Sequence, residues 1–463
     1  MSQKSSIHFE ISERKILLRI FDIVSVLGIL YVVGIVFNFD YFIIKKERWF
    51  WSIVLALYLT VFATIFELYD LQKASKFEIV VQNSILTSSV TVLIYLLTPF
   101  VAPVLPANRL QIVYFFISIN IALFLWRYAY IMLIATPRFH KRILLIANSK
   151  RVEGIISSLH KSDPNYKVTG FINVGKQKEK IKLPEVEEFS LEEIDTIISE
   201  NVISEIVIAT SQSDNVTVSL YNKLIGLLER GVAIREYTQV YEEITHRVPV
   251  QHVDKDFYRY FPFSRSNQNK LYLFFHRILD LLFSVIGLFF GLLISPIIII
   301  GNILGNRGPV FYTQMRVGKN GKHFKIYKLR SMIKDAEKHG AQFAKKKDTR
   351  VTRFGKFLRR SRFDEIPQFI NVIKGDMSVI GPRPERPVFV KELSEKIPFY
   401  EVRHLVKPGV TGWAQVNHKY GTGEEDALEK LQYDLYYIKK RSIFLDISIV
   451  IKTLSTIIFF RGQ

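Results

Sequence analysis

Four apolar stretches dominate the first part of the chain, at residues 20–38, 49–69, 79–101 and 110–134. A helix that crosses a bilayer needs about 20 predominantly apolar residues, so each stretch is close to the required length. The pattern predicts a bundle of four transmembrane helices in residues 1–140. A buried helical core of a soluble protein is the alternative interpretation.

Basic residues precede the first stretch and follow the fourth, which favours a cytoplasmic location for both ends, as an even number of spans requires. A basic cluster in the first loop, at residues 45–48, argues the other way. The first residues show no apolar core followed by a small-residue cleavage site, so we expect no removable signal peptide.

After Pro137 the pattern changes to short β-rich runs that alternate with helical segments. The runs cover residues 142–148, 167–173, 204–210 and 232–237. Because parallel strands need helical crossovers, they predict a doubly wound α/β domain in residues 141–262. A dinucleotide-binding fold carries Gly-x-Gly-x-x-Gly after its first strand, whereas this turn contains no glycine at residues 147–151. We expect a degenerate Rossmann-like domain with a regulatory or structural role.

A further apolar run, HRILDLLFSVIGLFFGLLISPIIIIGNILG, covers residues 276–305 and contains Ser295 and Pro296. Length alone predicts a fifth span, but a full crossing would put the α/β domain and the remaining residues on opposite sides of the membrane. Pro296 bends or breaks a helix, and Ser295 helps to satisfy the freed carbonyl groups. A re-entrant helix that enters and leaves by one leaflet and a kinked span both fit these residues.

The last apolar segment, residues 441–460, contains Asp446 and Lys452. A charge at the centre of a bilayer costs roughly 2.5–3.5 kcal/mol, which argues against a spanning helix. We expect an amphipathic helix, or one packed on the broken helix.

Composition agrees with a membrane protein that binds anions. The chain of 463 residues is 49% hydrophobic and carries a net charge of +20, so phospholipid head groups, nucleotides, phosphates or nucleic acid are the expected partners. It contains no cysteine, which excludes disulfides, thiol nucleophiles and thiolate metal sites. Oxygen ligands for a magnesium-like ion are the remaining metal option.

A basic segment, KKKDTRVTRFGKFLRRSRF, covers residues 345–363. Its apolar positions Phe354, Phe357 and Leu358 recur at helical spacing, which predicts a helix with an apolar stripe and basic flanks. Such a helix suits the surface of an anionic membrane. A solvated basic face is the alternative, and no recognisable nucleic-acid motif accompanies the charges.

Two adjacent acids, Asp364 and Glu365, follow this basic segment directly and precede Pro367. Carboxylates at a helix C-terminus are not favoured by the helix dipole, so a divalent cation and arginine-bound phosphates would compensate them. One carboxylate would hold the metal while its neighbour attacks phosphorus. A solvated helix end is the alternative interpretation of a lone acidic pair.

Other segments supply groups for the same chemistry. Gly-Pro-Arg-Pro at residues 381–384 holds Arg383 between two prolines, a rigid mount for a guanidinium that binds phosphate. Residues 314–318 and 327–332 add cations, and residues 408–417 supply Trp413, Gln415 and Asn417 to recognise a ring and its polar edge. Each segment alone also fits a turn or a surface charge.

Together and in this order, these segments resemble the bacterial polyprenyl-phosphate glycosyl-1-phosphate transferases of the monotopic superfamily. The resemblance covers about residues 270–463 and rests on the Ser-Pro helix, QMRVGKNGKHFKIYKLRSM, RVTRFGKFLRRSRFDEIPQFINVIKGDMSVIGPRP and KPGVTGWAQVN. The expected catalytic domain covers residues 263–463. The four N-terminal spans and the degenerate α/β domain resemble the large subgroup that initiates capsule, exopolysaccharide or O-antigen (lipopolysaccharide) synthesis.

The resemblance implies roles for matching residues. It implies that Asp364 is the nucleophile and Glu365 the magnesium ligand. It implies that Arg359 and Arg383 hold phosphate, that Lys328 and Arg330 belong to a basic substrate-binding motif, and that Ser295 and Pro296 form the break of a re-entrant membrane helix.

The implied reaction transfers a sugar 1-phosphate from a UDP-sugar to undecaprenyl phosphate and releases UMP, with Mg²⁺ as cofactor. The implied location is the bacterial cytoplasmic membrane, with the globular domains on its cytoplasmic face and membrane lipids, but no nucleic acid, as further partners. The middle domain is a candidate homodimer contact. The residues do not identify the sugar or the polysaccharide.

Two other functions remain open from the residues alone. A noncatalytic membrane regulator or scaffold would sense a ligand with its α/β domain and bind lipid with its basic region. A transporter with several spans would expose loops beyond residue 140 on both sides of the membrane.

Overall fold

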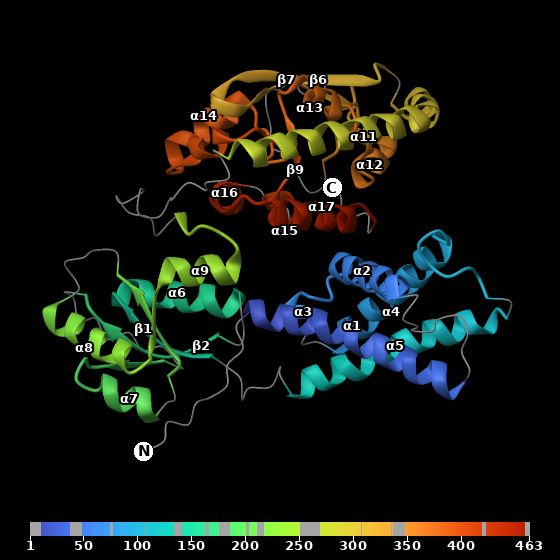
Figure 1. Cartoon of the computed structure of the whole chain (residues 1–463). Coiled ribbons are helices and arrows are strands. Elements are labelled where there is room, and N and C mark those ends of the chain that lie inside the picture. The colour runs from blue at the N-terminus through green and yellow to red at the C-terminus, as the bar shows by residue number, and fades with distance from the viewer. Residues whose placement is uncertain are drawn as a thin grey trace. The chain divides into compact units, whose positions relative to one another are not determined.

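The structure is a computed structural model, drawn in Figure 1. It describes residues 11–37, 49–74, 77–106, 108–133, 141–162, 166–175, 186–200, 203–210, 217–250, 269–306, 308–334, 336, 348–418 and 423–458. The chain divides into two compact units, residues 1–240 and 241–463. Residue 140 and residues 262–263, where we predicted domain boundaries, lie outside the described ranges.

The first unit begins with long apolar helices, as predicted. They are α1 (Ile11–Val36), α2 (Trp49–Ile65), α4 (Phe77–Leu97) and α5 (Leu110–Leu133), with the short α3 (Leu71–Ala74) before α4. Segments in α1, α4 and α5 are long and apolar enough to cross a membrane, whereas α2 is apolar but shorter. The helices pack on a shared core that includes Leu30, Leu55, Tyr95 and Phe115. The protein is therefore a membrane protein with a helical bundle.

A buried ion pair links two helices of this bundle. The guanidinium of Arg127 on α5 donates to both carboxylate oxygens of Asp22 on α1, at 3.0 and 2.5 Å, and to the carbonyl oxygen of Leu68 at 2.8 Å. Both side chains are almost fully buried. Because a charge in hydrocarbon is costly unless it is paired, this contact fixes how α1 and α5 pack.

The rest of the first unit contains a five-stranded parallel sheet, which confirms the predicted α/β domain. Its strands are β1 (Lys141–Ala147), β2 (Tyr166–Asn173), β3 (Glu187–Phe189), β4 (Glu205–Ala209) and β5 (Ala233–Glu236), in the order β3-β2-β1-β4-β5. Its helices are α6 (Ser149–Ser162), α7 (Ile194–Glu200) and α8 (Val218–Glu229). The sequence pattern located four of these strands but not the three-residue β3.

The turn after β1 is closed by side chains of the domain itself. The Oδ1 atom of Asn173, at the end of β2, accepts hydrogen bonds from the backbone N–H groups of Ser149 (3.3 Å) and Gly175 (2.9 Å). A nucleotide phosphate would bind such N–H groups at the start of a helix after β1. Here an amide oxygen occupies that position, in agreement with a degenerate fold.

The second unit is built around one long helix and several short elements. The helices are α9 (Tyr237–Thr245, entering from the first unit), α11 (Lys270–Gly305), α12 (Arg353–Arg360), α13 (Gln368–Lys374), α14 (Pro387–Lys396), α15 (Trp413–Asn417), α16 (Glu424–Lys440) and α17 (Ile443–Ile458). The strands are β6 (Phe311–Val317), β7 (His323–Leu329), β8 (Ser378–Ile380) and β9 (Gly409–Thr411). β6 and β7 form an antiparallel hairpin, and β8 and β9 pair in parallel.

Helix α11 contacts α12, α13 and β8 of the same unit (Figure 1). The helix is continuous from Lys270 to Gly305, with Pro296 inside it, so the predicted break does not separate two helices. The hydroxyl of Ser295 donates to the carbonyl oxygen of Leu292 at 2.7 Å. Most of its large apolar side chains are exposed, which fits a surface that contacts lipid.

The C-terminal helix α17 is packed rather than free. Ile449 belongs to a core shared with α14 and α16. Asp446 accepts hydrogen bonds from the hydroxyls of Tyr272 (2.5 Å) and Tyr437 (3.0 Å). Because Tyr272 belongs to α11, this contact agrees with the second of the two predictions, a helix packed on the helix that contains Ser295 and Pro296.

Residues 241–250 join the same unit. Their contacts include the ion pair of Glu242 with Lys439 at 2.6 Å and that of Arg247 with Glu429 at 2.7 Å. Residues 241–250, which follow the α/β domain in the chain, thus pack within the second unit.

Candidate active site

The two adjacent acids lie in a tight turn between α12 and α13. Thr352 caps α12 by accepting a hydrogen bond from the backbone N–H of Gly355 at 2.8 Å. After α12, Arg362 adopts a left-handed conformation (φ 60°), which turns the chain into a single 3₁₀ turn at Phe363–Glu365. Left-handed geometry is unfavourable for arginine, so the surrounding contacts must hold it. The turn directs both carboxylates into the protein.

Glu365 is held by three basic side chains. Its carboxylate pairs with the guanidinium of Arg383 at 3.0 Å, that of Arg362 at 3.3 Å and the ammonium of Lys328 at 3.7 Å. Burial alone would raise the pKa of Glu365, but the charges of Arg383 and Lys328 outweigh burial and lower the pKa to about 2. Glu365 is therefore ionised at neutral pH.

Asp364 has a different environment although it is the next residue. Its Oδ1 atom is buried and has no hydrogen-bond partner in the structure. Burial, and then the charge of Glu365, raise the pKa of Asp364 to about 6, while Lys328 and Arg359 act in the opposite direction. Asp364 is thus ionised at neutral pH, surrounded by cations and incompletely solvated.

Two rigid elements mount the cations. Arg383 follows β8 in the Gly-Pro-Arg-Pro segment, and the guanidinium of Arg403 donates to its carbonyl oxygen at 3.1 Å. At Gly381 an added Cβ would lie 2.3 Å from the carbonyl oxygen of Lys407, so the residue must be glycine. Lys328 stands on β7, where burial and the charge of Arg383 lower its pKa to about 8.

A small pocket adjoins these groups. Its lining consists of Arg316, Ile326, Lys328, Gln368, Arg383, Pro384 and Gly409. Asp364 does not line the pocket. Lys328 connects the two, because it lines the pocket and its charge lowers the pKa of Asp364. The cationic side chains of Arg316, Lys328 and Arg383 in this lining suit a phosphate group.

Two polar residues of the lining, Arg316 and Gln368, were not among the predicted site residues. Burial lowers the pKa of Arg316 to about 10. The amide nitrogen of Gln368 is buried without a hydrogen-bond partner. The sequence analysis included Arg316 only among the cations of residues 314–318. In the hairpin, Gln314 pairs with Ile326, and alternate residues of each strand share a face, so Arg316 lies on the same face as Lys328. Period-two alternation would have found Arg316, whereas only the tertiary structure identifies Gln368.

The other predicted phosphate-binding residues separate into two cases. The guanidinium of Arg359 donates to the hydroxyl of Ser331 at 2.9 Å, and its charge reaches Asp364. Arg330 instead donates to the carbonyl oxygen of Asn306 at 3.1 Å, beside Gly308, and does not line the pocket. Arg330 therefore joins the end of α11 to the hairpin, and its phosphate-binding role stays a prediction.

The expected ring-binding residues also have structural contacts. Trp413 is buried, and its indole N–H donates to the carbonyl oxygen of His246 at 3.0 Å. Gln415 donates to the carbonyl oxygen of Val410 at 3.1 Å, and Asn417 both donates to Trp413 and accepts from Lys452. These side chains stabilise α15 and α17, so the prediction that they recognise a sugar or base is not supported.

The donor set fits a magnesium ion bound together with substrate. Among the described residues, no group of three or more His, Cys, Asp or Glu side chains is close enough to enclose a metal. Mg²⁺ usually binds one or two carboxylates plus phosphate oxygens and water, which Asp364 and Glu365 can provide with a substrate phosphate. Both carboxylates are ionised at neutral pH, which metal binding requires.

Comparisons with known proteins match the second unit. The family model described as bacterial sugar transferase matches residues 271–460. The chain is 44% identical over 229 residues to a UDP-N-acetylgalactosamine-undecaprenyl-phosphate N-acetylgalactosaminephosphotransferase of Aeromonas hydrophila, covering 49% of this chain and 52% of the relative. It is 45% identical over 170 residues to a UDP-glucose:undecaprenyl-phosphate glucose-1-phosphate transferase of Escherichia coli (strain K12), covering 35% and 36%.

A shorter relative is matched almost over its full length. It is a Bacillus subtilis (strain 168) protein named as an uncharacterized sugar transferase, 35% identical over 189 residues, covering 40% of this chain and 90% of the relative. By contrast, the chain spans about half of the Aeromonas relative and about a third of the Escherichia relative.

Proposed function

The chain belongs to the bacterial sugar transferase family, and from that membership we propose that it transfers a sugar 1-phosphate from a UDP-sugar to undecaprenyl phosphate. The products are UMP and undecaprenyl diphosphate carrying the sugar. Relatives named for N-acetylgalactosamine and for glucose match similarly well, so the substrate class is a UDP-hexose. The reaction would be the first membrane step in the synthesis of an exopolysaccharide, capsule or O-antigen.

The observation that carries this proposal is the contrast within the acidic pair. Glu365 is fixed by ion pairs, whereas Asp364 keeps a buried oxygen without a hydrogen bond, beside the charges of Lys328, Arg359 and Arg362. A carboxylate that lacks hydrogen bonds is a better nucleophile than a fully solvated one, and the surrounding cations attract a diphosphate.

Two displacement steps at one phosphorus atom account for the reaction. In the first, a carboxylate oxygen of Asp364 forms a bond to the sugar-bearing phosphorus, and the bond from that phosphorus to the bridging oxygen breaks. UMP leaves with the bonding electron pair. In the second, a phosphate oxygen of undecaprenyl phosphate attacks the same phosphorus, and the aspartyl–phosphorus bond breaks to regenerate the carboxylate.

The cations hold the transferring group. Arg383 and Lys328, with Arg316, would bind the phosphate oxygens in the pocket, and Arg359 would contribute charge beside Asp364. Glu365 orients Arg383 and Lys328 through its ion pairs. Glu365, with a substrate phosphate, would hold Mg²⁺, which supplies neutralisation of the charge on the transferring phosphoryl group.

The contacts of α11 support a monotopic position in one leaflet. The side chain of Arg277 is bound to α13, and that of Asn306 donates to the carbonyl oxygen of Arg330 at 2.8 Å. Between them, the ring of Phe354 on α12 lies against Gly301. At about 1.5 Å per residue, Arg277 and Asn306 are about 44 Å apart along the helix, more than the roughly 30 Å of the hydrocarbon core.

A helix that crossed the bilayer would therefore draw the charged residues of α12 and α13 into hydrocarbon, which is unfavourable. Under our proposal α11 enters and leaves by the cytoplasmic leaflet, with Ser295 and Pro296 at its bend, so that the lipid substrate reaches Asp364 from the membrane side. Residues 1–140, 141–262 and 263–463 act as membrane, α/β and catalytic domains. The α/β domain would mediate dimer formation.

The test uses the purified full-length protein with magnesium, undecaprenyl phosphate and a panel of UDP-sugars. UMP release with at least one sugar, together with a phosphosugar adduct on Asp364 in mass spectra taken without the lipid acceptor, would support the proposal. No UMP from any sugar of a broad panel would reject it in favour of a noncatalytic regulator or scaffold.

A further inference from the structure

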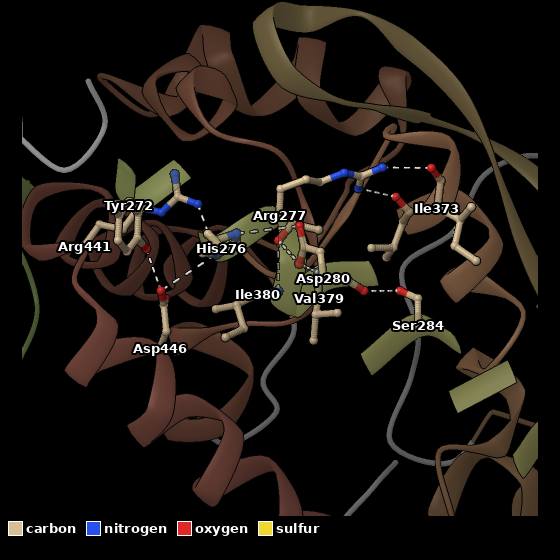
Figure 2. Close-up of polar contacts among 12 residues, drawn as sticks. Tyr272, His276, Arg277, Asp280, Ser284, Ile373, Val379, Ile380, Arg441 and Asp446 are labelled. Atoms are coloured by element: carbon tan, nitrogen blue, oxygen red, sulfur yellow. Dashed lines mark hydrogen bonds and ion pairs between the residues drawn. The ribbon is translucent and has the colours of Figure 1, made fainter. Parts of the chain in front are cut away.

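Two charged side chains of α11 hold the turn that joins α13 to β8. The guanidinium of Arg277 donates to the carbonyl oxygens of Val372 (2.6 Å) and Ile373 (2.9 Å), in the last turn of α13. The Oδ1 atom of Asp280 accepts from the hydroxyl of Ser378 (2.9 Å) and the backbone N–H of Val379 (2.8 Å), at the start of β8. Figure 2 shows both groups of contacts beside one stretch of α11.

These contacts have the polarity that each partner requires. The last carbonyl groups of a helix have no partner within the helix and carry partial negative charge, which a guanidinium satisfies. A backbone N–H and a hydroxyl at the start of a short strand are satisfied by the carboxylate. Asp280 is 4% exposed, so its hydrogen bonds are shielded from water.

The opposite ends of the same two elements carry the proposed catalytic groups. α13 begins at Gln368, directly after the turn that contains Asp364 and Glu365, and β8 ends at Ile380, just before the segment that contains Arg383. The ion pair between Glu365 and Arg383, at 3.0 Å, therefore connects the start of α13 to the end of β8. The contacts of α11 hold the end of α13 beside the start of β8.

We propose that Arg277 and Asp280 are positioning residues. They keep Asp364, Glu365 and Arg383 in the relative positions that phosphoryl transfer requires. This inference rests on the proposed function. Both residues contact the ends of α13 and β8 that are remote from the acidic pair, so each acts through α13 or β8 rather than on substrate. Because α11 is the lipid-facing helix of the unit, the same contacts tie the geometry of the site to the helix that would lie in the membrane.

A second group of polar contacts on α11 provides a matched control. The hydroxyl of Tyr272 donates to Asp446 on α17 at 2.5 Å and does not contact the turn between α13 and β8. His276 lies between the two groups, 3.7 Å from Asp446 and 3.6 Å from Asp280, and it is unchanged in this variant (Figure 2). Tyr272→Phe removes one buried hydrogen bond from the same helix and should lower stability without disturbing the acidic pair.

The experiment compares Arg277→Ala, Asp280→Ala and Tyr272→Phe in full-length protein reconstituted in lipid nanodiscs. Loss of positioning should lower kcat by about 100-fold with a change in KM for the UDP-sugar of less than about threefold, since a misplacement of about 1 Å has effects of this size. Asp280→Asn keeps an acceptor oxygen for Ser378 and Val379 and should recover most of the rate. Tyr272→Phe should stay within about twofold of the parent protein.

Hydrogen exchange provides a readout that needs no substrate. Asp280→Ala and Arg277→Ala should increase exchange in peptides covering residues 372–383, while Tyr272→Phe should not. Equal loss of kcat in Tyr272→Phe at matched melting temperature, or alanine variants with unchanged kcat, would overturn the inference.

The two proposals fail separately. If the parent protein releases no UMP, the proposed function and the catalytic part of this inference are rejected, and hydrogen exchange still decides whether the two side chains hold the turn. If the parent protein is active and exchange in residues 372–383 is unchanged in both alanine variants, the positioning inference alone is rejected.

Discussion

Two buried aspartates of the second unit, Asp364 and Asp434, have similarly raised pKa values but different hydrogen-bond partners. Burial raises the pKa of both to about 6. Asp434 accepts a hydrogen bond from the guanidinium of Arg403 at 2.7 Å, and Arg403 also donates to the hydroxyl of Tyr400 at 2.6 Å. The Oδ1 atom of Asp364 has no such partner.

The difference shows which property separates a catalytic candidate from a structural ion pair. A raised pKa follows from burial in both cases and does not discriminate. The unpaired Oδ1 atom of Asp364 discriminates only together with the cations around it, because buried atoms without a hydrogen bond also occur outside the pocket, at Arg330 and Gln415. The unpaired amide nitrogen of Gln368 has the same property, and it lies in the pocket lining.

The largest expected effect separates the two aspartates directly. Asp364→Asn should lower UMP release by about 10³-fold or more, because an amide cannot form the covalent intermediate. Asp434→Asn should keep UMP release within about tenfold and instead lower the melting temperature, because it weakens a buried ion pair. The comparison requires UMP assays and thermal unfolding of both variants. Equal activity loss in the two at equal folded fraction would remove the distinction.

A smaller effect is expected when a phosphate-binding cation is removed. Arg383→Ala should lower kcat/KM by about 100-fold, because it loses a charged donor to the transferring group and an ion pair with Glu365. Arg383→Lys should recover only part of this, since an ammonium lacks the planar fork of a guanidinium. Arg386→Ala is the matched control, because Arg386 stacks on Phe389 and does not line the pocket. Similar losses in Arg383→Ala and Arg386→Ala would contradict the assignment.

Local patterns in the sequence predicted the elements but not all of their partners. Apolar length identified the bundle helices, and alternation identified four strands of the sheet, because both signals are contained in neighbouring residues. The adjacent acids and Arg383 were visible as motifs. Trp413 was expected to recognise a ring because it is an aromatic residue in a turn-rich segment. It is instead buried, and its hydrogen-bond acceptor, the carbonyl oxygen of His246, belongs to a segment remote in the chain.

The same limit applies to Arg330, Gln368, Arg277 and Asp280. Each has a role set by a tertiary contact with residues of another element. Arg330 belongs to a run of basic residues, and only its contact with Asn306 distinguishes it from Lys328. Sequence reasoning can thus select the chemical groups of a site more readily than it can separate those that touch substrate from those that hold the site together.

The pH dependence of kcat/KM should follow the two perturbed groups. Asp364 must be ionised to act as nucleophile, so activity should fall about tenfold per unit below its pKa of about 6. Lys328 must be protonated to bind phosphate, so activity should fall again above its pKa of about 8. Lys328→Arg should move the alkaline limb upward and leave the acid limb in place. A flat profile between pH 5 and pH 9, about one unit beyond each limb, would contradict both roles.

The smallest effect is expected at Gln368, where stability and activity should change in opposite directions. Its amide nitrogen is buried without a partner, so Gln368→Met, of similar size, should leave the free energy of unfolding unchanged or raise it by about 1 kcal/mol. If that nitrogen donates to a substrate phosphate or sugar hydroxyl, the same change should lower kcat/KM roughly fivefold, the equivalent of one hydrogen bond of about 1 kcal/mol. Thermal unfolding measures the first effect and a UMP assay measures the second. The parent protein should also gain more stability from a UDP-sugar than the variant does. A variant that is less stable and equally active would place Gln368 with Asp434 as a structural residue, and the assignment of the site would then rest on Asp364 and the cations around it.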